Sequence, residues 1–157
     1  MITPTQLTDR DRDLMSQAVA LARKGLYTTK PNPRVGCLII QDHTIVGEGW
    51  HEKAGEPHAE IHALRNAGAR ARGAEVFVSL EPCAHQGRTG PCAQALINAG
   101  VQRVVSAMGD PNPKVAGRGH RMLEQAGIEV ILADDALGAR ELNSGFCRRM
   151  EAGRPLV

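Results

Sequence analysis

The sequence of 157 residues is poor in aromatic side chains and carries no surplus of charge of either sign. One tryptophan, one tyrosine and two phenylalanines leave few surfaces on which unpaired bases could stack. The formal net charge is +2, and no basic run concentrates it. A nucleic-acid partner is therefore not expected.

Long apolar stretches are absent as well. The longest, at residues 35–40, is far too short to cross a bilayer, and residues 1–13 are polar and charged, unlike a secretory signal. We therefore expect no membrane partner and a cytoplasmic location. Cysteines number four, and in a reducing compartment thiolates more often serve metal binding or catalysis than disulfides.

Short apolar and β-branched runs alternate with segments of helical periodicity along the chain. Thr8, followed three residues later by Asp11, has the pattern of a helix start. An antiparallel first pair of strands followed by helical crossovers predicts the α/β class, as a three-layer α/β/α sandwich around a mixed, roughly five-stranded sheet. Helices are expected at about 9–24, 58–69, 91–99, 121–126 and from about 135, and strands at about 35–40, 45–50, 75–80, 101–108 and 128–132.

Two segments carry residue types suited to a metal. His58 stands two residues before Glu60, and Cys83 follows a proline, with Cys92 nine positions further on. Each candidate ligand lies near an expected helix start, where the exposed N–H groups favour a thiolate. One imidazole and two thiolates suit tetrahedral Zn²⁺, and three protein ligands leave the fourth position for water. Glu60, outside the ligand set, could then move protons, so the pattern predicts a zinc-dependent catalytic site.

Zinc nucleobase deaminases carry the signature H-x-E followed by P-C-x-x-C. The chain departs from it in one respect, because eight residues, Ala84 to Pro91, separate the two cysteines. With this longer loop, the sequence resembles the deaminase domain of the bifunctional riboflavin-biosynthesis deaminase/reductase, within the cytidine-deaminase-like superfamily. The resemblance runs from about residue 10 to the end. It is carried by Asn32-Pro33-x-Val35-Gly36, Gly49-Trp50-His51, Gly55-Glu56-Pro57-His58-Ala59-Glu60, Leu80-Glu81-Pro82-Cys83-x-His85-x-Gly87-Arg88-Thr89-x-Pro91-Cys92, Asp110-Pro111-Asn112-Pro113 and Ala116-Gly117-Arg118-Gly119.

The resemblance implies hydrolytic deamination of 2,5-diamino-6-ribosylamino-4(3H)-pyrimidinone 5′-phosphate to 5-amino-6-ribosylaminouracil 5′-phosphate and ammonia, an early step of riboflavin biosynthesis. The only cofactor expected is Zn²⁺, on His58, Cys83 and Cys92, with Glu60 as the catalytic acid and base. The resemblance also implies a group of substrate-binding residues. In this group Asn32 and His51 would face the pyrimidine, Arg88 and Thr89 would hold the phosphate, and His85, Asp110 and Asn112 would line the pocket.

The same resemblance bears on domains and partners. Residues 1–150 are expected to form the deaminase domain, and residues 151–157 the start of a linker to a reductase domain absent from this chain. That reductase is expected in cis or as a separate chain. The family also suggests a homo-oligomer.

Alternatives remain at this point. The chain could deaminate another base, such as guanine, cytosine or adenosine in transfer RNA, or it could be a non-catalytic module stabilised by zinc. Glu60 distinguishes a deaminase from a non-catalytic module, because a structural zinc site has no need of a free carboxylate. A metalloprotease H-E-x-x-H motif involving His62 is excluded, because Glu60 is not adjacent to His58. His85 lies between the cysteines and could itself be a ligand.

Other reactive side chains have ordinary explanations. Cys37 lies in an apolar strand and is expected to pack in the core. His43 falls in a hairpin turn and His120 at a junction between loop and helix. Both histidines are expected to contact solvent.

Overall fold

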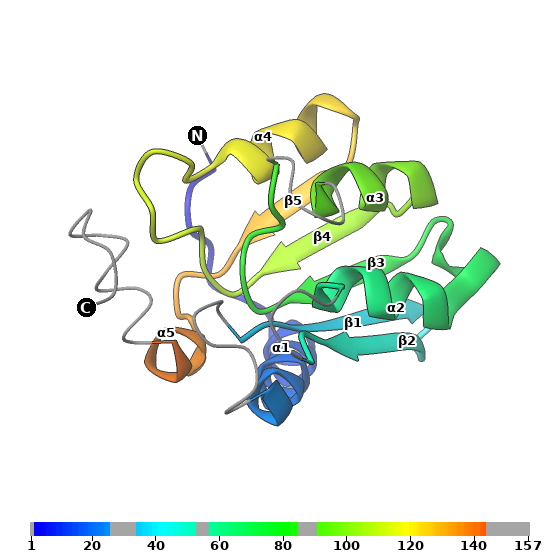
Figure 1. Cartoon of the computed structure of the whole chain (residues 1–157), viewed down its shortest axis with the longest axis horizontal. Helices are drawn as coiled ribbons and strands as arrows, with labels where there is room; N and C mark the ends of the chain where they lie inside the picture. Colours follow the sequence, from blue (N-terminus) through cyan, green and yellow to red (C-terminus); the bar gives the residue numbers. More distant parts are fainter. Residues whose placement is uncertain (1, 26–33, 53–56, 85–90, 144–157) are drawn as a thin grey trace.

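The computed structural model describes residues 2–25, 34–52, 57–84 and 91–143, and it is a three-layer sandwich (Figure 1). This architecture confirms the predicted α/β class and its mixed sheet of five strands. The helices and strands are α1 (Asp9–Ala22), the 3₁₀ turn η1 (Arg23–Gly25), β1 (Gly36–Gln41), β2 (Thr44–Trp50), α2 (Ala59–Ala67), η2 (Gly68–Ala71), β3 (Glu75–Val78), α3 (Cys92–Ala99), β4 (Arg103–Ser106), α4 (Arg118–Gln125), β5 (Glu129–Leu132) and α5 (Ala139–Leu142).

The sheet has the order β2-β1-β3-β4-β5. β1 pairs antiparallel with both of its neighbours, whereas β3, β4 and β5 pair in parallel. β2, β3 and β4 therefore run in one direction, and their carboxyl ends meet at one edge of the sheet. His51 follows β2, Cys83 follows β3 and Asp110 follows β4, so the topology brings these three positions to the same edge.

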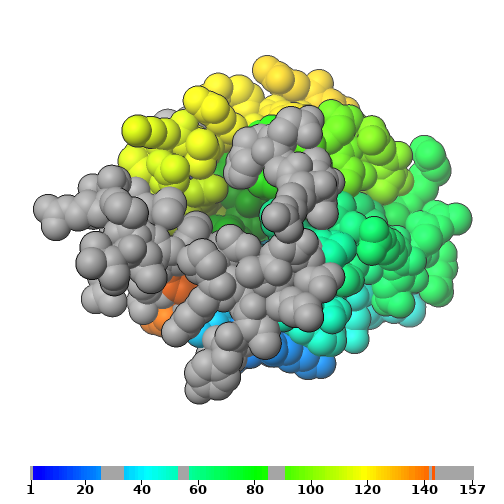
Figure 2. Space-filling view, in the orientation of Figure 1, coloured from blue at the N-terminus to red at the C-terminus, as the bar shows by residue number. Residues whose placement is uncertain are grey.

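Helices cover both faces of the sheet. α1 packs on β1 and β3, α2 packs on β1 and β2, and α3 lies between α2 and α4 (Figure 1). The space-filling view shows α3 in green and α4 in yellow side by side on one face of the molecule (Figure 2). The buried core between the layers includes Met15, Cys37, Phe77, Leu96 and Val105, so the expectation for Cys37 is confirmed.

Two glycine contacts set how closely helices approach the sheet. A Cβ on Gly36 would lie 1.9 Å from the Ala18 carbonyl oxygen of α1. On the neighbouring strand, a Cβ on Gly49 would lie 2.6 Å from the Ala59 carbonyl oxygen of α2. Adjacent strand residues face opposite sides of a sheet, and Gly49 pairs with Cys37, next to Gly36. α1 and α2 therefore pack on opposite faces through these glycines.

The edge of the sheet opposite His51 and Cys83 is held by ion pairs. Arg103 at the start of β4 contacts the buried Asp11 of α1 at 2.6 Å and Glu75 of β3 at 2.7 Å, and Arg10 adds a contact to Glu75 at 2.9 Å. Burial alone would raise the pKa of Asp11, but hydrogen bonds and charge from Arg103 and Arg10 hold that pKa below its ordinary value. This network ties the first helix to the sheet.

Several element boundaries differ from the predicted ones. The strand expected at 101–108 is confined to 103–106, and the helix expected from 121 begins at Arg118, directly after Gly117 with φ 85°. The last helix begins at 139 and not 135, because Leu137 and Gly138 adopt φ of 54° and 91°, which a right-handed helix does not allow. None of the helices in the described part of the chain has the length and apolar character that crossing a bilayer requires.

The close packing of α2 on β2 leads to a prediction. Gly49→Ala should lower the free energy of unfolding by roughly 1–3 kcal/mol, because the new methyl group displaces α2 from the strand. Zinc affinity should fall as well, since His58 immediately precedes this helix. Urea unfolding and zinc titration measure the two effects. Glu48→Ala, an exposed position on the same strand, is the control, and equal stability of both variants would contradict the prediction.

Candidate metal centre and active site

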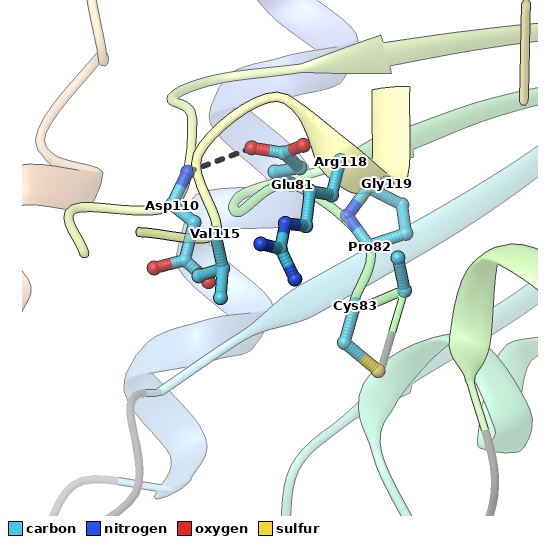
Figure 3. Close-up of a pocket in the computed structure, with 8 residues that line it drawn as sticks. Glu81, Pro82, Cys83, Asp110, Val115, Arg118 and Gly119 are labelled. Carbon is cyan, nitrogen blue, oxygen red and sulfur yellow. Dashed lines mark hydrogen bonds between the residues drawn. The ribbon is translucent and has the colours of Figure 1, made fainter. Parts of the chain in front are cut away.

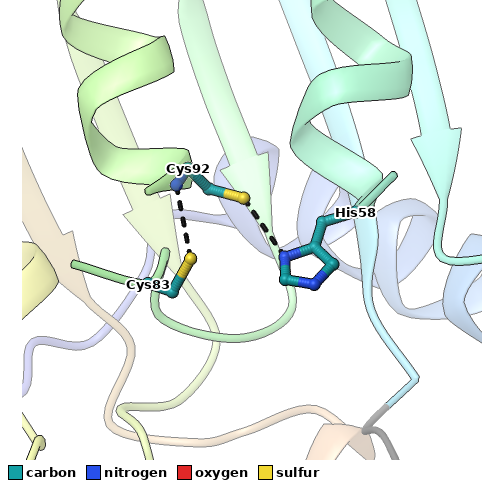
Figure 4. A group of neighbouring side chains, drawn as sticks. All are labelled: His58, Cys83 and Cys92. Atoms are coloured by element: carbon teal, nitrogen blue, oxygen red, sulfur yellow. Dashed lines mark hydrogen bonds between the residues drawn. The ribbon is translucent and has the colours of Figure 1, made fainter. Parts of the chain in front are cut away.

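Three predicted ligands converge at one edge of the sheet (Figure 4). His58 is the N-cap residue of α2, Cys92 is the first residue of α3, and Cys83 lies in the loop after β3. Their ligand atoms all lie within 4.8 Å of one another. Pro57 directly precedes the N-cap residue of α2, and Pro91 is itself the N-cap residue of α3. The structure thus brings together residues that are 34 positions apart in the sequence.

Hydrogen bonds connect the three side chains. The His58 Nδ1 atom lies 3.3 Å from the Cys92 Sγ, and the backbone N–H of Cys92 donates to the Cys83 Sγ at 3.3 Å. Donation from the Cys92 side chain lowers the pKa of Cys83 to about 4, with burial opposing and His58 adding to the effect. The same contact raises the pKa of the Cys92 thiol, and contact with Cys83 raises that of His58. Cys83 is thus held as a thiolate, the form that binds metals.

The donor set fits zinc. One imidazole and two sulfur atoms form a borderline-soft group, and three protein ligands suit a tetrahedral ion whose fourth position takes water or substrate. Among the residues that the structure describes, no histidine, cysteine or carboxylate joins this group as a fourth ligand. The two helix starts add the positive ends of their dipoles, which stabilise the thiolate charge. His85, the other potential ligand in the sequence, lies outside the described residues.

Glu60 lies in the first turn of α2 and is 4% exposed. Burial raises the pKa of its carboxyl group to about 7, although its own backbone N–H and the nearby His58 oppose this effect. A pKa near neutrality suits a group that both accepts and donates a proton during one reaction. Glu60 is not part of the metal group, but its carboxyl group is near enough to His58, Cys83 and Cys92 to interact with them.

The structure describes three of the predicted substrate-binding residues. His51 is buried, and its ring lies edge-on to that of His58, with ring centres 5.1 Å apart. Asp110 is partly buried and lines a cavity of about 60 Å³ together with Cys83 (Figure 3). The side chain of Asn112 accepts a hydrogen bond from the Lys114 backbone, so it shapes its own loop. Asn32, His85, Arg88 and Thr89 lie outside the described residues, and the binding roles of all seven stay predictions.

Two residues of this region had been assigned no role from the sequence. Arg118 directs its guanidinium group into the cavity that Asp110 and Cys83 line (Figure 3). Glu81 lines the same cavity, and its carboxylate accepts backbone hydrogen bonds. Both belong to the sequence motifs that carry the family resemblance, and a single charged side chain between two glycines was the signal that could have singled out Arg118.

The expectation that His120 contacts solvent is wrong. The residue is 3% exposed, and its Nε2 atom lies 2.8 Å from the Ser106 hydroxyl oxygen. α4 begins three residues earlier than predicted, so position 120 falls within the helix and faces the end of β4. Burial lowers the pKa of the His120 imidazole and so favours its neutral form, although the nearby Glu81 acts to raise that pKa.

Known proteins share this arrangement. Residues 8–108 match the model of the cytidine and deoxycytidylate deaminase zinc-binding region. Diaminohydroxyphosphoribosylamino-pyrimidine deaminase of Buchnera aphidicola (Schizaphis graminum) is 47% identical over 93% of this chain and 99% of that protein. The chain therefore belongs to the zinc-binding cytidine and deoxycytidylate deaminase family, which confirms the predicted class of enzyme and its zinc dependence.

Within this family the chain is similar to riboflavin biosynthesis proteins. Riboflavin biosynthesis protein RibD of Escherichia coli K12 is 56% identical over 94% of this chain and 40% of that protein. The structure of Acinetobacter baumannii RibD, form 2, superposes with a TM-score of 0.89 at 55% identity, over 93% of this chain and 41% of the other. These matches confirm the predicted family resemblance. The chain spans about two fifths of the length of the RibD proteins that it matches.

The convergence of the three side chains predicts the outcome of losing one. Cys92→Ala should weaken zinc binding by more than the roughly 10–100-fold that loss of an outer-shell partner costs, because two protein ligands remain. Cys37→Ala, which removes a buried thiol from β1, is the matched control and should retain zinc. Competition with a chromogenic chelator gives both affinities. Equal zinc content and affinity in the two variants would exclude Cys92 from the metal centre.

Proposed function

We propose that this chain deaminates 2,5-diamino-6-ribosylamino-4(3H)-pyrimidinone 5′-phosphate, giving 5-amino-6-ribosylaminouracil 5′-phosphate and ammonia. The observation that carries this proposal is the group of His58, Cys83 and Cys92 beside a buried carboxyl group that is not part of it. A structural zinc site would have no use for Glu60 in that position. The deaminase name of a Buchnera relative that the chain covers almost completely supports the choice of substrate.

In the proposed mechanism His58, Cys83 and Cys92 hold the zinc ion and Glu60 moves protons. When bound, zinc lowers the pKa of water and makes hydroxide available at neutral pH. The Glu60 carboxylate accepts the proton that water releases and donates it to a ring nitrogen of the substrate while the C–O bond forms. In the tetrahedral adduct it then accepts the proton of the new hydroxyl group and passes this second proton to the departing amine. The C–N bond to the amino group breaks as the C–O single bond of the adduct becomes a carbonyl, so one water is consumed for each ammonia formed.

The remaining pocket residues would select the substrate. Asn32 and His51 would face the pyrimidine ring, and the buried ring of His51 next to His58 supports this role. Arg88 and Thr89 would hold the ribose phosphate, while His85, Asp110 and Asn112 would complete the wall. The position of Asp110 beside Cys83 supports its part in this assignment.

The larger assembly follows from the same proposal. Residues 1–150 would form the deaminase domain and residues 151–157 the start of the linker to a reductase domain, in cis or on a separate chain. The share of E. coli RibD that the chain spans, 40%, leaves room for such a domain in that protein. The homo-oligomeric state and the cytoplasmic location stay predictions.

The role of Glu60 is tested by Glu60→Gln, which keeps the size of the side chain and removes its acid and base function. Turnover should fall by roughly 10²–10⁴-fold with zinc content and folding unchanged. Glu124→Gln, the same change at an exposed position of α4, is the control. The assay measures ammonia released from the diaminopyrimidinone ribotide, with cytidine and guanine as comparison substrates.

Two outcomes would contradict the proposal in different ways. Full turnover by the Glu60→Gln variant would remove Glu60 from the chemistry. Wild-type activity on cytidine or guanine, with none on the ribotide, would overturn the substrate while leaving the deaminase mechanism in place.

The phosphate assignment predicts a selective defect. Arg88→Ala should raise KM for the ribotide roughly tenfold, as expected for loss of a hydrogen bond to a charged group. KM for the dephosphorylated analogue should change little, and Arg70→Ala, which removes an exposed charge from η2, should change neither value. Steady-state kinetics on both compounds measure these effects, and equal increases on the two would exclude Arg88 from the phosphate site.

A further inference from the structure

The Glu81 carboxylate connects the loop after β3 with the segment that follows β4. Its Oε1 atom accepts hydrogen bonds from the backbone N–H groups of Asp110, at 2.9 Å, and Gly117, at 3.0 Å. Its Oε2 atom accepts one from the N–H of His120, at 3.1 Å. The side chain is 2% exposed, so these bonds are made away from solvent. One buried carboxylate thus holds both ends of the segment from 110 to 120. Figure 3 shows the bond to Asp110.

The backbone packs closely at the same place. A Cβ on Gly119 would lie 1.8 Å from the carbonyl oxygen of Pro82, the residue between Glu81 and Cys83. No side chain larger than hydrogen fits there without displacing α4 from the loop that carries the predicted zinc ligand. The contact between the two segments is therefore set by direct backbone packing as well as by hydrogen bonds.

The charge of Glu81 is balanced by backbone dipoles. The nearest imidazole nitrogen, Nδ1 of His120, lies 3.7 Å from Oε2, but burial favours the neutral form of this histidine. The three N–H groups include those of Gly117, the N-cap residue of α4, and His120 in its first turn. A carboxylate at that end of a helix satisfies N–H groups that have no partner within the helix. Glu81 therefore acts as a cap supplied from another part of the chain.

The segment that Glu81 holds lines the cavity that borders the predicted zinc ligand Cys83. Asp110 and Arg118 both line this cavity. The backbone N–H of Asp110 itself binds Glu81, and Arg118 directly follows Gly117, whose N–H also binds Glu81. We propose that Glu81 is a positioning residue that fixes Asp110 and Arg118 relative to the metal centre and so determines substrate affinity. This inference rests on the proposed function, because it assigns the wall of that same active site.

A carboxylate is required here for a geometric reason. Glutamine has the same shape, but one of its two terminal atoms is an NH₂ group that cannot accept a hydrogen bond. With its oxygen toward Asp110 and Gly117, the amide would place N–H against the N–H of His120. In the opposite orientation the NH₂ group would face the N–H groups of Asp110 and Gly117. Either arrangement loses at least one of the three bonds and buries two donors against each other.

The experiment compares Glu81→Gln with Glu124→Gln as the matched control. In Glu81→Gln, KM for the ribotide should rise about tenfold, the change expected for loss of one hydrogen bond to a charged group, while kcat falls less and zinc content stays at the wild-type level. Amide hydrogen exchange at Asp110, Gly117 and His120 should become faster, with β3 and β4 unchanged. A purely structural role would lower stability without this separation of KM from kcat.

A second variant perturbs the packing of α4 on the loop after β3 without changing Glu81. Gly119→Ala should push α4 from Pro82 and raise KM in the same direction, with zinc retained. It also keeps the proposal testable if Glu81→Gln fails to fold.

The exchange measurement needs no substrate, so it separates this inference from the proposed function. A wild-type chain that releases no ammonia from the ribotide would overturn the function, whereas unchanged exchange at the three amides in Glu81→Gln would overturn the anchoring role of Glu81. Loss of zinc in that variant, or unchanged KM in both Glu81→Gln and Gly119→Ala, would also overturn it.

Discussion

Three metal-binding atoms from distant parts of the chain can meet here because of the direction in which the strands run. β1 pairs antiparallel with both β2 and β3, so the strands on its two sides point the same way. The parallel pairing of β4 then adds a third carboxyl end to that edge. α2 begins at this edge after β2 and brings His58 there. The loop after β3 and the start of α3 bring Cys83 and Cys92 to the same edge. If β2 or β3 ran in the other direction, His58 or Cys83 would lie at the other end of the sheet.

Two kinds of contact convert this topology into a site of defined shape. Glycines in β1 and β2 let helix backbones approach the sheet closely, which determines where α2 begins and therefore where His58 and Glu60 lie. At the cavity next to Cys83, the Glu81 carboxylate and the absence of a side chain at Gly119 allow α4 to pack against the loop after β3. The ion pairs of Arg103 with Asp11 and Glu75 lie at the opposite edge. Hydrogen bonds and close backbone packing thus hold one edge of the sheet, and ion pairs hold the other.

Local patterns were a good guide to the elements and a weaker guide to their ends. The order of helices and strands in the described residues follows the predicted one, because alternation and helical periodicity are properties of short windows. Their limits depend on backbone angles that the pattern does not contain. Gly117 adopts a left-handed conformation, and α4 starts earlier than predicted directly after it. Leu137 and Gly138 also have positive φ, and they delay the start of α5. The burial of His120 follows from this shift of one helix turn, so its environment could not be read from its neighbours in sequence.

The chemistry of the metal group was evident from residue types and spacing, because few proteins place a histidine, a free glutamate and two cysteines in this order beside prolines. The same motifs identified the deaminase family. The tertiary structure alone decided that Glu60 is buried enough to bring its pKa to about 7, and that Glu81 accepts three backbone hydrogen bonds from a segment 29 to 39 residues away. Both properties depend on which atoms surround a side chain in space, and a linear pattern does not record those neighbours.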